Sequence, residues 1–265
     1  MNYKLLALDL DGTLLDKNNN ITDKTKNVLH KLKQNGLKIV IATGRMFCSA
    51  LPYVTRLNLN GPVITYNGAY VKDTESEKVL LHKPVAIDLA QEIINDCQKH
   101  NLHLNLYQKD TLYVAQSNKL SQGYEKASGV TAREVGSLAD FVSEDPTKLL
   151  AIENNRDKQQ RYLNLFKKKY RGQLEVSESK SNYIEFMSRG VSKGQALKFV
   201  AEKNFIKQKE VIAIGDSWND LSMLEWAGIG VAVETAAPEI KSRVDLVAPP
   251  PESDGIASVL EQIFN

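Results

Sequence analysis

Short apolar segments recur along the chain, and each of them ends in a polar or glycine-containing loop. Runs of this kind, rich in β-branched residues, are typical of strands that are buried on both faces of a parallel sheet. They predict four strands, at residues 5–10, 37–42, 63–66 and 210–214.

Helical periodicity separates the first two of these strands, because apolar residues there recur at the spacing of one helix face. Thr22 or Asp23 can cap the start of this helix, and Asn35-Gly36 supplies its stop. The same spacing predicts a terminal helix at residues 256–263. Strands interspersed with helices predict an α/β fold, with a Rossmann-like parallel sheet as its core.

Residues 84–187 have a different character, because helical and strand-like runs are mixed there without the pattern of the core. We interpret them as an inserted α+β domain, hinged near Pro84 and Ser188, within a core made of residues 1–83 and 188–265. The runs in the insert lie at residues 87–100, 102–107, 112–115, 149–153 and 157–170.

Polar residues follow each predicted core strand. Asp9, Thr43, Asn67 and Asp216 all stand where a strand ends. In open α/β sheets, ligands bind beyond the carboxyl ends of the strands. The sequence therefore predicts that four polar loops converge on one rim of the sheet.

Composition narrows the class of protein. The chain is 42% hydrophobic and 25% charged, and its net charge is only +2, which disfavours a protein that coats nucleic acid. Cys48 and Cys97 lack zinc or disulfide spacing, and the four histidines lack metal-ligand spacing. The first apolar run is broken at Asp9, too early for a signal peptide or a membrane span. We expect a cytoplasmic protein that binds neither nucleic acid nor a membrane.

The segment Asp9–Thr13 reads DLDGT. Two carboxylates one residue apart at the end of a buried strand are costly unless a cation or a proton lies between them. Gly12 allows a sharp turn, and Thr13 can orient a neighbouring carboxylate. The alternative interpretation is a simple Asx turn.

A second acidic cluster, within residues 215–224, also follows an apolar strand. Magnesium prefers octahedral oxygen ligation at roughly 2.0–2.1 Å and keeps several waters, so few protein ligands are needed. Asp9, Asp216 and the carbonyl of Asp11 would suffice. Helix capping by Ser217 or Asn219 is the alternative, but it explains only one or two of the polar residues in this cluster.

Two further features suggest anion binding. Thr43-Gly44-Arg45 follows a strand, where a hydroxyl, a backbone N–H and the positive end of a helix can hold a phosphate oxygen. Lys193 precedes a helical pattern and could neutralise charge on a transferring phosphoryl group. The alternatives are N-capping by Thr43 and a solvated surface role for Lys193.

In this order, DLDGT, Thr43-Gly44-Arg45, Lys193 and GDSWND (residues 215–220) resemble the four motifs of the haloacid dehalogenase (HAD) superfamily. Asn67-Gly68-Ala69 and the large insert are similar to the Cof-type branch, subfamily IIB, which carries an α/β cap of the C2B kind. The resemblance extends over essentially the whole chain.

The resemblance implies a role for each matching residue. Asp9 would be the nucleophile that forms an aspartyl-phosphate, and Asp11 the acid/base that protonates the leaving group and then activates water. Thr43, the Gly44 N–H and Lys193 would bind the phosphate. Relatives with threonine at the position of Asp11 are P-type ATPases, whose phosphoenzyme persists, so Asp11 favours rapid turnover.

The same resemblance implies that Asp216 ligates magnesium with Asp9 and the Asp11 carbonyl. Asp220 would support the metal through water or through Lys193, and Asn219 would help to bind phosphate. Arg45 could reach the substrate, and Asn67 is expected to support this rim.

The chain departs from the family pattern at residues 233–236, which read Val-Glu-Thr-Ala where relatives have a Met-Gly-Asn-Ala-like stretch. An asparagine contact is lost, which changes the expected substrate end of the site. Asp254-Gly255 is still expected to close the core.

Other polar and aromatic residues are less specific. Glu185 is a candidate to face the cleft from the insert, whereas Tyr107, Tyr113 and Tyr183 are expected to finish a half-buried sheet face. Trp218, in the second acidic loop, is expected to be a packing residue.

Together these features predict a phosphatase that uses Mg²⁺ to hydrolyse a small phosphorylated metabolite, such as a sugar phosphate or a phosphorylated cofactor. We expect a monomer or a weak homo-oligomer. Two alternatives stay open: a phosphomutase or phosphotransferase on the same fold, and a phospholigand-binding module whose turnover is vestigial.

Overall fold

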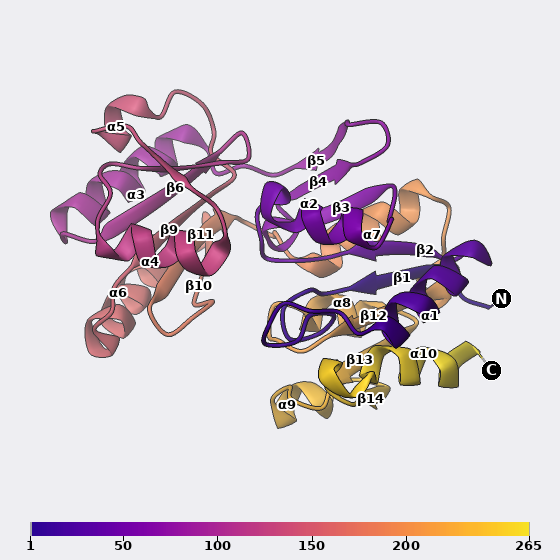
Figure 1. The fold of residues 1–265 in the computed structure, drawn as a ribbon. Coiled ribbons are helices and arrows are strands. Elements are labelled where there is room, and N and C mark those ends of the chain that lie inside the picture. Colours follow the sequence, from indigo (N-terminus) through magenta and orange to yellow (C-terminus); the bar gives the residue numbers. More distant parts are fainter. Residues whose placement is uncertain (1, 265) are drawn as a thin grey trace. The chain divides into compact units, whose positions relative to one another are not determined.

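The computed structural model describes residues 2–264, which divide into two compact units (Figure 1). The first unit, called the core, comprises the residues up to 45, residues 50–81 and the residues from 192 onward. The second unit, called the cap, comprises residues 46–49 and 82–191. The sequence places these boundaries near 83/84 and 187/188.

The core is built on a five-stranded sheet in the order β14-β13-β12-β1-β2. All of its strand pairs are parallel. The strands are β1 (Leu5–Leu8), β2 (Lys38–Ile41), β12 (Val211–Gly215), β13 (Ile229–Val233) and β14 (Leu246–Ala248). A small sheet adjoins it through a bridge between Ala42 and Ile64, and consists of β3 (Pro62–Thr65), β4 (Tyr70–Asp73) and β5 (Val79–His82).

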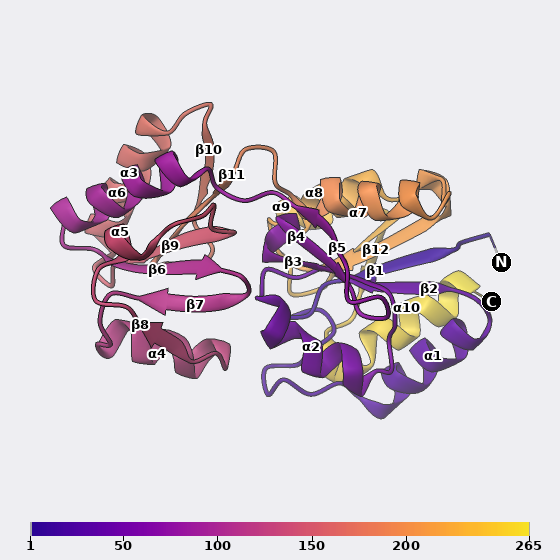
Figure 2. The ribbon, with the colours of Figure 1, turned by 90° about the horizontal axis from the view of Figure 1, so that it is seen from above.

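Helices cover both faces of the core sheet, with α7 and α8 on one side and α1 and α10 on the other (Figure 2). Side chains of β1, α7 and α8 share one buried apolar cluster. The core helices are α1 (Asp23–Gln34), α2 (Phe47–Arg56), α7 (Lys193–Lys203), α8 (Leu221–Trp226), α9 (Pro238–Lys241) and α10 (Gly255–Phe264), and the short 3₁₀ turns are η1 (Tyr66–Gly68), η2 (Gln208–Glu210) and η3 (Pro251–Ser253).

The cap has its own six-stranded mixed sheet in the order β10-β11-β9-β6-β7-β8. Its strands are β6 (His103–Gln108), β7 (Thr111–Val114), β8 (Ala132–Glu134), β9 (Lys148–Ile152), β10 (Leu174–Ser177) and β11 (Tyr183–Ser188). Its helices are α3 (Ile87–Lys99), α4 (Lys119–Ser128), α5 (Leu138–Phe141) and α6 (Arg156–Lys169). Side chains of α3 and α6 pack with the sheet in one apolar cluster, while Tyr124 of α4 contacts the rings of Tyr107 and Tyr183.

The α/β class and the inserted α+β cap are therefore confirmed, and most predicted elements lie within one or two residues of the observed ones. Of the two residues predicted to cap α1, Thr22 does so, by accepting a hydrogen bond from the N–H of Thr25, whereas Asp23 is the first residue of the helix. The first strand ends at Leu8 rather than at residue 10. Four strands of the core were not predicted: β4, β5, β13 and the three-residue β14.

Within residues 2–264, no helix combines the length and the apolar character that crossing a membrane requires.

Gly194 and Gly123 form a matched pair of helical glycines. A Cβ on Gly194, in α7, would overlap the carbonyl oxygen of Ser222, whereas a Cβ on Gly123, in α4, would meet no atom within 4 Å. We expect Gly194→Ala to lower the free energy of unfolding by about 1–3 kcal/mol through overpacking. Gly123→Ala should raise it by roughly 0.5–1 kcal/mol, because alanine is the better helix former. Urea titration followed by circular dichroism measures both, and a stabilised Gly194→Ala would contradict the close α7–α8 packing.

Candidate active site

Asp9 and Asp216 lie side by side because β1 and β12 are neighbouring strands. The register pairs Leu8 with Ile214, and the N–H of Asp9 donates to the carbonyl of Ile214 at 3.0 Å. The chain continues from β1 to β2 on one side, while β12 lies on the other side, so a topological switch point falls between β1 and β12. Switch points at the carboxyl ends of strands are where α/β proteins bind ligands.

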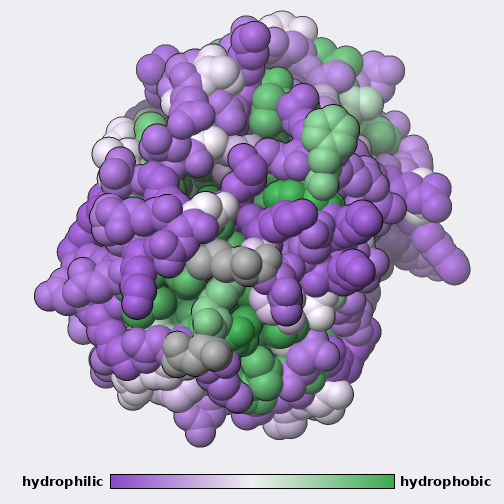
Figure 3. Space-filling view, turned by 90° about the vertical axis from the view of Figure 1, so that its right-hand side faces the viewer, coloured by the Kyte–Doolittle hydropathy of each residue, from purple (hydrophilic) through white to green (hydrophobic). Residues whose placement is uncertain are grey.

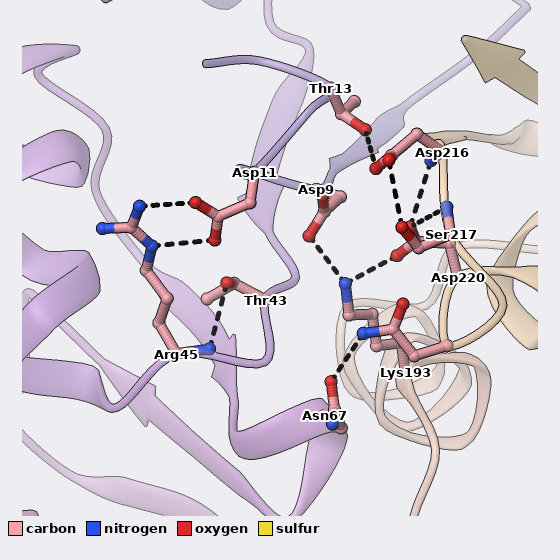
Figure 4. Close-up of polar contacts among 11 residues, drawn as sticks. Asp9, Asp11, Thr13, Thr43, Arg45, Asn67, Lys193, Asp216, Ser217 and Asp220 are labelled. Atoms are coloured by element: carbon pink, nitrogen blue, oxygen red, sulfur yellow. Dashed lines mark hydrogen bonds and ion pairs between the residues drawn. The ribbon is translucent and has the colours of Figure 1, made fainter. Parts of the chain in front are cut away.

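Lys193 stands between two carboxylates in this site. Its Nζ lies 2.6 Å from Asp9 Oδ1 and 2.6 Å from Asp220 Oδ1 (Figure 4). The three residues are 1%, 4% and 0% exposed, respectively. The alternative of a solvated surface lysine is therefore wrong. Because Ser192 caps α7, Lys193 is the first residue of that helix and extends from its N-terminus.

Burial and charge displace the pKa values of this group. Burial raises the pKa of Asp9 well above its usual range, and the nearby charge of Asp220 adds to the effect, while Lys193 opposes it. Burial alone would lower the pKa of Lys193, but the charges of Asp220 and Asp9 outweigh it and raise that pKa. Burial and Asp220 also raise the pKa of Asp216. Lys193 therefore remains charged. A further cation beside Asp9 and Asp216 would favour their ionised forms.

The loop after β12 is held by its own side chains. Asp220 Oδ2 accepts hydrogen bonds from the N–H groups of Asp216 and Ser217, at 3.1 and 3.0 Å. The hydroxyls of Thr13 and Ser217 each donate to Asp216 at 3.0 Å. Thr13 thus orients a neighbouring carboxylate, as the sequence suggested, while Ser217 had been considered only as a helix cap.

Gly12 is required where the two acidic loops approach each other. Its φ is +80°, which L side chains rarely adopt, and a Cβ there would lie 2.8 Å from Asp216 Oδ2. Any larger residue would push Asp216 away from Thr13.

The donors in this group fit a metal ion. Asp9, Asp216 and Asp220 each place one carboxylate oxygen within 4.8 Å of the others. Hard oxygen ligands of this kind suit Mg²⁺. The sequence had assigned Asp220 an indirect role. The side chain of Asp11 lies elsewhere, so only its carbonyl remains a candidate ligand.

Arg45, in the loop between β2 and α2, binds the carboxylate of Asp11. Its Nε and Nη2 donate to the two Asp11 oxygens at 2.8 and 2.5 Å, and Nη2 also lies 3.2 Å from Asn19 Oδ1. The guanidinium lies 4.9 Å from the centre of the Tyr53 ring. The two hydrogen bonds make this a bidentate ion pair, the stronger kind of arginine–carboxylate contact. Hydrogen bonding to Asp11 also raises the pKa of Arg45. Neither Asn19 nor Tyr53 had been predicted, because neither belongs to a motif.

Thr43, Asn67 and Asn219 complete the rim. Thr43 is buried, and its hydroxyl accepts a hydrogen bond from the Arg45 N–H at 3.1 Å. Asn219 Nδ2 donates to Asn67 Oδ1 at 2.9 Å. A Cβ on Gly44 would lie 2.8 Å from the same Asn67 oxygen, so the glycine leaves room for this contact. The predicted core site residues therefore lie in three groups of contacts, around Lys193, Arg45 and Asn67, in the loops that follow the strands (Figure 4).

Glu185 lies in the cap, on β11, where it is 5% exposed. It forms a buried salt bridge with Lys148 at 2.9 Å and accepts a hydrogen bond from Ser179 at 2.9 Å. Its carboxylate is thus engaged by residues of the cap itself, and a direct role toward a ligand stays a prediction.

Trp218 and the 233–236 departure also lie on the carboxyl side of the core sheet. Trp218 is 59% exposed, so its expected packing role is wrong. Glu234 follows β13, where its N–H donates to the Ala248 carbonyl and its own carbonyl accepts from Lys241 Nζ, both at 2.8 Å. At Glu234, where the sequence departs from the family pattern, both backbone polar groups are therefore hydrogen-bonded.

Comparison with known proteins agrees with this geometry. A sequence model of the haloacid dehalogenase-like hydrolases matches residues 6–260. The pyridoxal phosphate phosphatase YbhA of Escherichia coli is 28% identical, over 98% of each chain. The fold matches the crystal structure of a Thermotoga maritima protein with a TM-score of 0.92 and 32% identity, covering 99% of this chain and 98% of that one. A subclass IIB sugar phosphatase matches in fold, with a TM-score of 0.83 and 23% identity, over 98% of each chain.

The chain therefore belongs to the haloacid dehalogenase-like hydrolases. The resemblance read from the four motifs is confirmed.

Removing the Lys193 ammonium leaves two buried carboxylates without their cation. We expect Lys193→Met to lower the free energy of unfolding by about 3–5 kcal/mol in metal-free buffer. Lys198→Met is the matched control, because Lys198 lies on the same helix, is exposed, and has only a long contact of 3.9 Å to Glu202. Its effect should stay below about 0.5 kcal/mol. Equal losses in the two variants, measured by urea titration, would argue against a cation-dependent cluster.

Proposed function

We propose that this chain is a magnesium-dependent phosphatase that hydrolyses small phosphomonoesters through an aspartyl-phosphate on Asp9. The observation that carries this proposal is the buried Lys193 bridge between Asp9 and Asp220, next to Asp216. It supports the proposal because three carboxylates and one fixed positive charge, the groups that this reaction needs, lie together.

Asp9 attacks with Oδ2, the oxygen that Lys193 does not contact. A bond forms between this oxygen and phosphorus while the bond to the leaving oxygen breaks. Lys193 neutralises charge on the transferring phosphoryl group. Because Lys193 is held by Asp220 as well, it keeps its position when Asp9 becomes esterified.

Asp11 provides the acid and then the base. It donates its proton to the leaving oxygen, and then takes a proton from the water that attacks phosphorus, which breaks the Asp9–phosphorus bond and releases inorganic phosphate. The contact with Arg45 fixes the Asp11 carboxylate in its present direction. Since a phosphate dianion also suits a guanidinium fork, we infer that substrate draws Arg45 away and frees Asp11.

Asp9, Asp216 and the carbonyl of Asp11 would hold Mg²⁺, with Asp220 in support. When bound, the ion offsets the negative charge of the carboxylates and of the phosphoryl oxygens. Thr43, the Gly44 N–H and Asn219 hold the remaining phosphate oxygens.

The substrate class is a small phosphorylated metabolite, either a sugar phosphate or a phosphorylated cofactor. The relative that hydrolyses pyridoxal phosphate supports the second choice. Trp218 directly precedes Asn219 in the sequence, and its exposed ring offers an aromatic surface for the organic part of such a substrate. A panel of phosphorylated metabolites, assayed for released phosphate, identifies the preferred substrate.

Asp11→Asn tests the acid/base assignment. We expect kcat to fall by about 10²–10⁴-fold, the range for loss of general acid–base catalysis. Asp16→Asn is the control, because Asp16 lies in the same segment and its Oδ1 only holds a turn by accepting from Asn18 and Asn20. It should keep its activity within about twofold. If Asp11→Asn retained full magnesium-dependent turnover, Asp11 would not be the acid/base.

Removal of magnesium tests the metal assignment. Chelation should abolish phosphate release, and added Mg²⁺ should restore it, because the nucleophile lies among like charges. Asp216→Asn should require a higher Mg²⁺ concentration for half-maximal activity than the unaltered enzyme. Activity that is insensitive to chelation would contradict this proposal.

An alcohol acceptor separates hydrolysis from group transfer. A hydrolase releases one phosphate per molecule of dephosphorylated product even when the acceptor is present. A transferase instead produces a newly phosphorylated acceptor, which phosphorus NMR detects.

A further inference from the structure

A groove of about 660 Å³ opens in the core at the amino ends of its strands. Its lining includes Leu5 and Lys38, the first residues of β1 and β2. The acidic cluster follows the last residues of β1 and β12 instead. All strands of this sheet run in the same direction, so the groove and the acidic cluster lie at opposite ends of the strands. A strand of four residues, about 13 Å long, separates them. The groove is therefore distinct from the candidate active site.

Four segments of the core form the walls of this groove. They are the end of α1 with the start of β2, the turn before β3, the β4–β5 hairpin and the last turn of α7. Figure 3 shows the right-hand side of the view in Figure 1, where apolar patches lie between hydrophilic residues. The apolar part of the lining includes Leu37, Ile39, Leu59, Leu80 and Val200. A volume of this size suits a small molecule with an apolar part.

Lysines dominate the charge of the groove. Lys33, Lys38, Lys78 and Lys203 line it, against two acidic residues, Asp73 and Glu75. Several positive charges around one concave surface attract anions.

Two of these charged groups are already engaged. Lys33 donates to the carbonyl of Asn58. Asp73 Oδ1 accepts from the N–H groups of Glu75 and Ser76, which holds the hairpin turn and lowers the pKa of Asp73.

The other lysines are available. Among residues 2–264, Lys38, Lys78 and Lys203 have no side-chain hydrogen bond or ion pair, and each is exposed. Lys33 and Lys203 lie in the last turns of α1 and α7, where the helix dipole stabilises a positive charge. That explanation does not extend to Lys38, the first residue of β2, or to Lys78, which directly precedes β5.

We propose that this groove binds a small organic anion that joins an aromatic ring to a phosphate group, of the class of a nucleoside monophosphate. The ring lies on the apolar part of the lining, and the phosphate lies among Lys38, Lys78 and Lys203. Such binding is additional to the phosphatase reaction and uses none of its residues.

AMP is the probe for the experiment. Calorimetric titration uses the full chain with Asp9→Asn, so that AMP is not consumed. The variant Lys38→Glu/Lys78→Glu/Lys203→Glu should raise the dissociation constant for AMP by at least about tenfold at low salt, because three attractive charges become repulsive. Adenosine and inorganic phosphate, each lacking one half of the probe, should bind more weakly than AMP.

Lys17, Lys31 and Lys209 provide the matched control, because they are exposed lysines of the core that do not line the groove. Their triple replacement by glutamate changes the net charge equally and should leave the dissociation constant within twofold. With Asp9 intact, both triple variants should retain phosphatase activity, which shows that they fold. The proposal is overturned if AMP binds the two triple variants equally, or if AMP at millimolar concentration does not bind the parent chain.

Discussion

The site depends on one buried interaction, the ammonium of Lys193 held between the carboxylates of Asp9 and Asp220. Burying any one of these charges alone would be costly, and burying the two acids without a cation would be costlier still. The lysine makes the cluster possible before any substrate or metal arrives. Because α7 begins at this residue, the rigidity of a helix fixes the position of the charge.

The rest of the core can be understood as support for that contact. The parallel pairing of β1 with β12 brings Asp9 beside the loop that carries Asp216 and Asp220. Gly12 keeps the two loops close, and Gly215 lets the second loop fold back on itself, since a Cβ on Gly215 would lie 2.5 Å from the Cβ of Asp220. Backbone N–H groups of the second loop bind Asp220 and hold it toward Lys193. Substitutions in these glycines would therefore alter chemistry through geometry rather than through charge.

The fold class, the cap insertion and the core residues of the site could be predicted from the sequence, because motifs at strand ends fix both residue type and place. The contacts of Arg45 could not be predicted. Its partners, Asn19 and Tyr53, lie in a loop and on a helix face whose approach depends on tertiary packing. Trp218 was misjudged for a similar reason, since an aromatic at a helix start gives no sign of whether a neighbouring element covers it. The edge strand β14 was missed because its three residues carry little periodic signal, and β13 was missed although it has five residues and lies inside the sheet.

The long chain separation between Asp9 and Lys193, 184 residues, has a consequence for biosynthesis. During translation Asp9 emerges before the cap, and the neighbouring strand β12 becomes available only after the cap. A nascent chain therefore carries an incomplete sheet edge at β1, and no complete acidic cluster, until Lys193 and the loop after β12 have left the ribosome. Until β12 is available, β1 is paired with β2 alone, and its other edge stays open to non-native pairing.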